Sequence, residues 1–213
     1  MSLSIISLKL LVVFGTVSSV FAQQAPDLEP PKYKIGDSWT WAVTVNPRDA
    51  CTTNVLAGAK ATQVVDAMTD TGYSVAVSGP GTGVNFKRTY SKDLTFSGSA
   101  GGVPVKSNLL NFPLKAGNTW DTSIGNGNVL QTLSCKSAEF ESLKVGGEEL
   151  QVMPIVCTGR WKNLSSNNTD RSTFKYWYSP KVGNFARQTV FTYFQGGTCV
   201  DVDWRLESYK VSD

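Results

Sequence analysis

Apolar and polar residues alternate along most of the chain from Ile35 onward. In residues 38–45 (SWTWAVTV), apolar side chains fill every second position, and small or polar residues fill the positions between. The same period recurs in residues 73–77 and 84–90, and it is clearest in residues 200–207 (VDVDWRLE). A period of two is typical of a strand with one buried and one solvated face. The pattern therefore predicts an antiparallel sheet.

Two further segments are apolar on both faces. Residues 150–161 and 185–194 mix apolar side chains at even and odd positions, which is typical of strands covered on both sides. Glycine-rich breaks separate the apolar runs at residues 79–83, 98–102, 125–128 and 196–197. No segment keeps a helical period for more than about two turns. We predict an all-β fold with about ten strands in a meander, forming a single domain over residues 35–213.

The first 22 residues have the pattern of a secretory signal peptide. Lys9 precedes the apolar run 10–14, and small residues lead to Ala22 before Gln23. Polar residues interrupt the run, so it is too short to span a membrane. We expect cleavage near Ala22-Gln23 and a periplasmic or secreted protein. Residues 23–34, which are polar and rich in proline, are expected to form an extended linker.

Four cysteines follow the expected cleavage site, at positions 51, 135, 157 and 199. An even number in an exported chain favours two disulfides, for which three pairings are possible. Residues 144–148 resemble a hairpin turn, and reflection about Gly146 places Cys135 opposite Cys157. We favour Cys135–Cys157, which leaves Cys51–Cys199. Four free thiols are the alternative, and a zinc site is disfavoured because no C-x-x-C pair is present.

The chain contains no histidine, which removes the Ser-His-Asp, Cys-His and usual zinc hydrolase sites. The pair Asp201 and Asp203, about 7 Å apart on one strand face, has a spacing that suits a glycosidase or a metal. A solvated outer face is the favoured interpretation of this pair, and also of Glu139 and Glu141. We predict no catalytic residue, no cofactor and no metal. The basic residues are scattered, which argues against nucleic acid as a partner.

Two sequons, Asn163-Leu164-Ser165 and Asn167-Asn168-Thr169, lie in a polar loop. They are either glycosylation acceptors or plain turns. No apolar segment after the signal peptide is long enough to span a membrane.

Aromatic residues are the candidates for ligand binding. Trp39, Trp41 and Trp204 fall on apolar strand faces and are expected in the core. Residues 174–178 (FKYWY) carry apolar bulk on both faces, so one face is a candidate lining for a cavity or a partner surface. The alternative is ordinary core on one side and an exposed aromatic on the other. The candidate lining consists of Phe174, Tyr176, Trp177, Tyr178, Phe191 and Tyr193.

Residues 176–187 (YWYSPKVGNFAR) resemble the motif YWYSPxVGxxVR of exported bacterial proteins of unknown function. Residues 33–39 (YKIGDSW), 112–120 (FPLKAGNTW) and 204–210 (WRLESYK) are similar to the opening, middle and end of those proteins. The resemblance implies a curved antiparallel sheet, a half-barrel or open-barrel meander similar to the periplasmic half-barrels that carry lipoproteins or lipids. It brings no catalytic residue. The four cysteines depart from the family's usual pattern.

Three functions follow from these observations. The first is a non-enzymatic β-protein that binds an apolar ligand or a lipidated partner on a concave aromatic face. The second is a structural or interaction module of an envelope assembly, which would use exposed strand edges or an aromatic patch. The third is a carbohydrate-binding or carbohydrate-active protein, with tryptophan stacked on sugar and the Asp201/Asp203 pair as acids.

Overall fold

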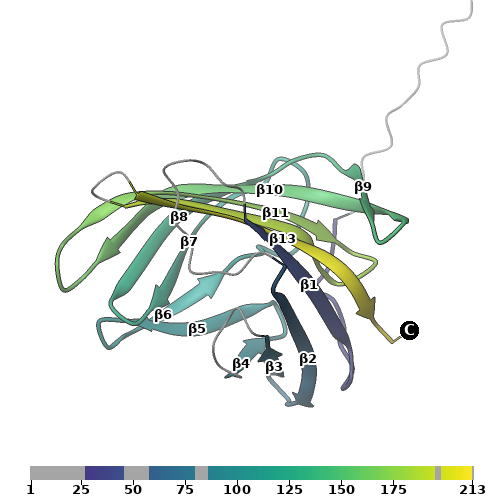
Figure 1. Cartoon of the computed structure of the whole chain (residues 1–213). Coiled ribbons are helices and arrows are strands. Elements are labelled where there is room, and N and C mark those ends of the chain that lie inside the picture. The colour runs from purple at the N-terminus through teal and green to yellow at the C-terminus, as the bar shows by residue number, and fades with distance from the viewer. Residues whose placement is uncertain (1–26, 46–57, 80–85, 195–197, 213) are drawn as a thin grey trace, which may run out of the picture.

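The computed structural model describes residues 27–45, 58–79, 86–194 and 198–212. Those residues form one antiparallel sheet of 13 strands (Figure 1). No helix among them is long and apolar enough to cross a membrane. The strands are β1 (Ser38–Val45), β2 (Lys60–Met68), β3 (Gly72–Ser78), β4 (Phe86–Ser91), β5 (Thr95–Ala100), β6 (Val103–Asn108), β7 (Thr119–Asn126), β8 (Val129–Ser137), β9 (Glu141–Val145), β10 (Glu148–Asn163), β11 (Thr169–Ser179), β12 (Asn184–Phe194) and β13 (Thr198–Lys210).

Neighbouring strands in the sheet are mostly neighbours in sequence. The order is β6-β5-β4-β3-β2-β1-β13-β12-β11-β10-β8-β7, and β9 pairs with β10. Among the strands of the described residues, the pairing of β1 with β13 joins the two ends of the sequence. The predicted all-β meander is confirmed, but the strand count exceeds the expected ten. Short strands such as β5, which contains Gly98, and β6, which contains Pro104, lack the alternation that marks the longer ones.

The sheet curls until its two ends meet. The backbone N–H of Gly101, after β5, donates to the carbonyl of Gly127, after β7, at 2.7 Å. A Cβ atom on Gly98 would lie 2.5 Å from the carbonyl oxygen of Gly125. The two backbones can approach this closely because both strands carry glycine at the crossing. The result is a strongly curved, nearly closed sheet, in agreement with the expected half-barrel or open barrel (Figure 1).

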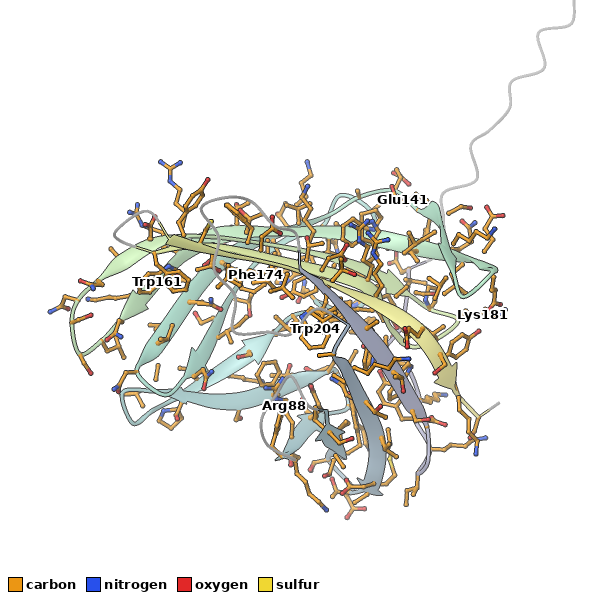
Figure 2. The ribbon with its side chains drawn as sticks, in the orientation of Figure 1. Arg88, Glu141, Trp161, Phe174, Lys181 and Trp204 are labelled. Carbon is orange, nitrogen blue, oxygen red and sulfur yellow. A yellow bond between two sulfur atoms is a disulfide. The ribbon has the colours of Figure 1, made fainter. Side chains whose placement is uncertain are left out.

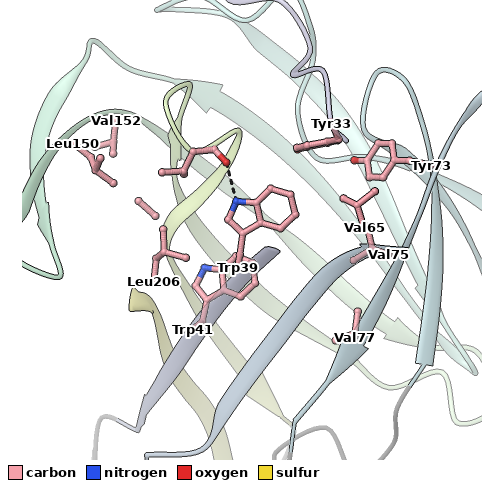
Figure 3. Close-up of a cluster of buried hydrophobic side chains, with 12 residues drawn as sticks. Tyr33, Trp39, Trp41, Val65, Tyr73, Val75, Val77, Leu150, Val152 and Leu206 are labelled. Atoms are coloured by element: carbon pink, nitrogen blue, oxygen red, sulfur yellow. Dashed lines mark hydrogen bonds between the residues drawn. The ribbon is translucent and has the colours of Figure 1, made fainter. Parts of the chain in front are cut away.

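Tryptophans from β1 anchor one part of the core on the inner side of the sheet (Figure 3). Trp39 is 1% exposed, and its indole N–H donates to the carbonyl of Val182 at 2.8 Å. The Trp41 indole N–H donates to the carbonyl of Phe185 at 2.9 Å. Trp204, from β13, packs half-buried against the same cluster. These contacts confirm the expected core tryptophans, and each buried indole N–H of β1 has a partner.

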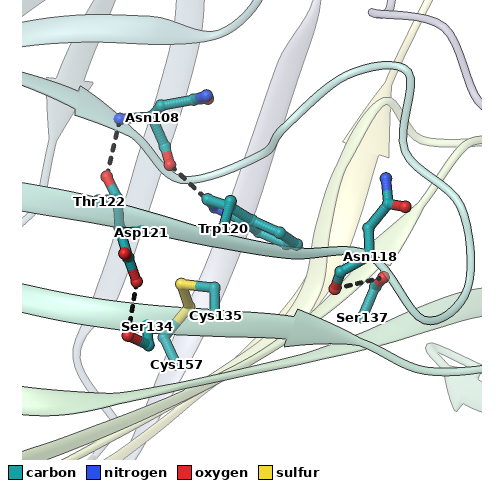
Figure 4. The surroundings of a disulfide bond; sticks show 9 residues. All are labelled: Asn108, Asn118, Trp120, Asp121, Thr122, Ser134, Cys135, Ser137 and Cys157. Carbon is teal, nitrogen blue, oxygen red and sulfur yellow. Dashed lines mark hydrogen bonds between the residues drawn. A yellow bond between two sulfur atoms is a disulfide. The ribbon is translucent and has the colours of Figure 1, made fainter.

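A disulfide joins Cys135 of β8 to Cys157 of β10 (Figure 4). The two residues are direct partners in the antiparallel register, with Cα atoms 4.0 Å apart. The predicted pairing is therefore confirmed. Cys199 is buried, but Cys51 lies outside the described residues, so the pairing Cys51–Cys199 stays a prediction.

The N-terminal segment, residues 27–34, packs against the sheet instead of forming a free linker. Leu28 forms an isolated bridge with Leu114, with both N–H···O distances at 2.8 Å. Tyr33 is 9% exposed, and its hydroxyl donates to the carbonyl of Gly183. The linker prediction is wrong for these residues because their few apolar side chains find partners far along the chain. The expected signal peptide, its cleavage site and residues 23–26 lie outside the described residues.

Candidate functional site

Three of the six predicted lining residues belong to the packed core. Phe174, Tyr176 and Tyr178, from β11, are 7%, 3% and 1% exposed. They pack in one cluster with Met153 and Ile155 of β10 (Figure 2 labels Phe174 under the upper strands, within the curve of the sheet). Burial raises the pKa of both tyrosines, so their hydroxyls stay neutral. These rings therefore belong to the packed core.

The other three residues lie on the opposite side of the sheet. The Trp177 indole N–H donates to Oε1 of Glu141 at 2.8 Å, and the Arg187 guanidinium lies 4.7 Å from the centre of the Trp177 ring. Phe191 and Tyr193 meet edge to face, with ring centres 4.6 Å apart. Because successive side chains of a strand point to opposite faces, the six residues cannot form one lining. The prediction that they share one concave face is wrong.

The two aspartates of β13 are buried, which corrects the expected solvated face. Asp201 is 6% exposed and Asp203 is 1% exposed. Two arginines bind Asp203: Arg187 donates from Nε at 2.9 Å and from Nη2 at 2.8 Å, and Arg205 donates from Nη2 at 2.8 Å. The carboxylate of Asp203 is therefore held as an ion-paired structural group. Among the described residues, no three acidic or cysteine side chains cluster as metal ligands would.

An interior cavity of about 150 Å³ lies on the inner side of the sheet, between the two largest core clusters. Its aromatic wall combines Tyr33 of the N-terminal segment with Tyr73 of β3 and Tyr90 of β4. Tyr33 and Tyr73 meet edge to face at 4.7 Å, and Tyr73 and Tyr90 stack at 5.3 Å (Figure 3 shows the first pair). The wall thus consists of three packed aromatic rings, each of which carries a hydroxyl group.

Polar side chains from three strands reach the same cavity. They are Gln63 of β2, Arg88 of β4 and Gln188 of β12. Arg88 lies opposite Val75 of β3, a core residue that is 2% exposed, so its side chain is on the inner face. The register thus places a cation inside the curved sheet.

An open groove of about 620 Å³, termed here the end groove, adjoins the cavity. Pro30 and Pro31 form one side, and Met68 of β2 contributes a side chain that is 45% exposed. Tyr33 and Tyr73 line both the groove and the cavity. The Tyr33–Tyr73 pair therefore separates an apolar surface groove from the interior.

The hydroxyl groups of the Tyr33–Tyr73 pair stay neutral in this region. Desolvation raises the pKa of Tyr33 and of Tyr73 well above the usual tyrosine range. Asp93, at the end groove, has its pKa lowered, chiefly by the hydrogen bond that the Ser91 hydroxyl donates to it. Near neutral pH the side chains of Tyr33 and Tyr73 are therefore uncharged, whereas Asp93 is ionised.

Sequence reasoning missed the residues that line the cavity. One signal was present: the alternation that places Phe86 and Tyr90 on an apolar face places Arg88 on the same face. A charged residue on an otherwise apolar strand face marks either a buried ion pair or a binding group.

No protein-family model and no curated protein sequence matches this chain. Among solved structures, the chain is similar to a "putative lipoprotein" from Parabacteroides distasonis, at 13% sequence identity and a TM-score of 0.46. The match covers 86% of this chain and 97% of that chain. A likeness at this level carries no conclusion about function. The resemblance to exported proteins with a YWYSPxVGxxVR motif accordingly stays a prediction.

Proposed function

We propose that this chain is an exported, non-enzymatic protein that binds an apolar ligand, or the apolar anchor of a lipidated partner, through the end groove and the interior cavity. The observation that carries the proposal is that Tyr33 and Tyr73 line both spaces. Concave, mainly apolar surfaces with aromatic walls and a few convergent polar groups are typical of small-molecule sites. The site thus differs from the aromatic lining that the sequence predicts.

The two volumes limit the size of the ligand. The cavity, at about 150 Å³, matches an engineered apolar cavity that holds about one benzene ring. The end groove, at about 620 Å³, falls within the range of roughly 300–1,000 Å³ that is usual for ligand pockets. A ligand with a long apolar portion therefore needs the groove, and only one end of it enters the cavity.

Entry into the cavity requires the Tyr33–Tyr73 contact to open. Tyr33 belongs to a short segment that is attached through the Leu28–Leu114 bridge and through its own hydroxyl bond to Gly183. Tyr73 is fixed within β3 and stacked on Tyr90. Tyr33 is therefore the side that would move, because it lies outside the strands of the sheet whereas Tyr73 belongs to β3.

The two alternatives have less support. Free strand edges would favour an assembly module, but β6 and β7 lie at the ends of the sheet and those ends pack against each other. A carbohydrate-active site would need accessible acids, but Asp201 and Asp203 are buried and Asp203 is bound to two arginines.

Uptake of the neutral apolar dye N-phenyl-1-naphthylamine tests the proposal. The purified protein should enhance the dye's fluorescence in a saturable way. Val75→Phe, which adds a ring at the cavity wall, should weaken uptake at least severalfold. Val156→Phe is the matched control, because Val156 is 38% exposed and lines neither space. No saturable uptake by the unaltered protein, or equal uptake by both variants, would overturn the proposal.

Native mass spectrometry of protein purified from its own compartment without detergent complements the dye assay. An added mass that extracts into organic solvent would support the proposal and identify the cargo. A clean polypeptide mass together with an inactive dye assay would favour the interaction module instead.

A further inference from the structure

We propose that the ligand of this site is an amphipathic monocarboxylic acid, and that Arg88 binds its carboxylate inside the cavity. This inference rests on the proposed function and names the chemical class of the ligand. Cζ of Arg88 lies 4.7 Å from the ring centre of Phe96 and 5.4 Å from that of Phe86. Ring faces attract a guanidinium and orient it, but they leave its N–H donors unbonded.

Within the described ranges, Arg88 has neither an ion-pair partner nor a hydrogen bond from its side chain. The contrast with Arg187 and Arg205 is informative, because both of those arginines bind Asp203. A guanidinium has five N–H donors in a fork that fits the two oxygens of a carboxylate. Arg88 is half-buried at the cavity, so its unbonded N–H donors are available to a partner from outside the chain.

The neighbouring amides strengthen this assignment. Gln63 and Gln188 line the same cavity from β2 and β12, and neither side-chain amide makes a hydrogen bond in the described part of the chain. Each offers two N–H donors to the cavity that Arg88 also lines, and a carboxylate has about four acceptor positions. Donors from three strands thus line one cavity that a carboxylate could enter.

The charge of the residues that line the cavity favours a ligand group with a single negative charge. Arg88 is the only cation among the described residues that line it, and no acidic residue lines it. A phosphate monoester carries about −1.5 to −2 at neutral pH, so one guanidinium would leave part of its charge unpaired. A carboxylate carries one unit and matches. With its head at Arg88, the apolar remainder of the acid would pass the Tyr33–Tyr73 pair toward the end groove.

Competition against N-phenyl-1-naphthylamine tests this assignment with three probes of equal chain length: decanoic acid, decan-1-ol and decyl phosphate. At neutral pH the acid should displace the dye at a concentration roughly ten- to a hundredfold below that of the alcohol, the range expected for a charge-assisted hydrogen bond. Arg88→Gln should remove this preference by weakening the acid alone, and Arg88→Lys should restore part of it. Arg171→Gln, at an exposed position on β11, is the control and should retain the preference.

The outcomes separate the two proposals. Dye uptake with equal displacement by acid and alcohol would overturn the acidic head but leave apolar binding intact. Tighter binding of decyl phosphate than of decanoic acid would overturn the single negative charge. Absence of dye uptake would overturn the proposed function, and this inference with it. If Arg88→Gln does not fold, as monitored by near-UV circular dichroism, the acid-to-alcohol comparison on the unaltered protein decides the question.

Discussion

The buried carboxylates of Asp37 and Asp203 each accept hydrogen bonds from one donor close in sequence and from another farther along the chain. Asp37, just before β1, is 0% exposed. Its Oδ2 accepts the backbone N–H of Lys34 at 2.8 Å, and its Oδ1 accepts that of Ser212 at 2.9 Å. One side chain therefore ties the N-terminal segment to the end of the last strand. Asp203 is held in the same manner by Arg187 and Arg205, whereas Arg88 has no carboxylate partner in the described part of the chain.

Replacing Asp37 should destabilise the fold. Asp37→Ala removes two charge-assisted hydrogen bonds and leaves two backbone N–H groups without their acceptor, which should lower the free energy of unfolding by about 2–4 kcal/mol. Asp37→Asn keeps one acceptor oxygen and should fall between alanine and the unaltered protein. Urea unfolding measures the loss, with the exposed Asp121→Ala as control. A loss below about 1 kcal/mol for alanine would contradict this role.

The buried tyrosines should make stability fall in alkali. Burial raises the pKa of Tyr33, Tyr73, Tyr176 and Tyr178 in the folded state. A raised folded pKa stabilises the fold fully below the unfolded value, about 10 for tyrosine, and the contribution is lost as the pH rises toward the folded value. Absorbance at 295 nm should therefore show these four phenols ionising only as near-UV dichroism disappears. Smooth ionisation of all seven tyrosines in a folded sample would contradict this expectation.

At the scale of the strands, the closure of the sheet depends on small residues where its ends cross. A Cβ on Gly125 of β7 would lie 2.8 Å from the carbonyl carbon and oxygen of Ser99 and 2.8 Å from Cγ2 of Val105. Two of those three atoms belong to backbone, which cannot move aside as a flexible side chain can.

Gly125→Ala should therefore cost about 1–3 kcal/mol, the range for overpacked sites. Ser97→Ala, at an exposed position of β5, is the control and should stay within about 0.5 kcal/mol. Urea unfolding of both variants gives the comparison. Equal stability of the two would mean that the sheet ends separate without loss.

The sequence predicts a strand well when one face of that strand is buried and the other is exposed to solvent, because only then do apolar and polar residues alternate. Alternation predicts β1, β3 and β13, but it does not predict that Asp201 and Asp203, on the polar face of β13, are buried. It cannot predict the register shifts at Thr40/Trp41 and Trp177/Tyr178, which depend on sheet curvature. In β11 both faces are bulky, so composition did not distinguish core from lining. The cavity depends on contacts between Tyr33, β3 and β4, and no local pattern encodes that juxtaposition.

At the scale of the whole molecule, the beginning and end of the described chain meet beside the candidate site. The N-terminal segment runs past the end groove, Tyr33 separates that groove from the cavity, and Asp37 then binds the chain after β13. The β1–β13 pairing brings these parts together. Access to the interior is therefore coupled to how firmly the N-terminal segment is held.

This coupling predicts a kinetic effect of removing one hydroxyl. Tyr33→Phe keeps the aromatic ring that packs against Tyr73 but loses the hydrogen bond to the carbonyl of Gly183. This loss should destabilise the arrangement in which the two rings are in contact by about 0.5–1.5 kcal/mol. If Tyr33 must move for a ligand to pass, N-phenyl-1-naphthylamine should enter and leave roughly two- to tenfold faster, measured by stopped-flow fluorescence. Its affinity should change little, because the apolar walls remain. Tyr193→Phe, on the other side of the sheet, is the control. Unchanged rates in Tyr33→Phe would mean that ligands reach the cavity by a route other than the Tyr33–Tyr73 pair.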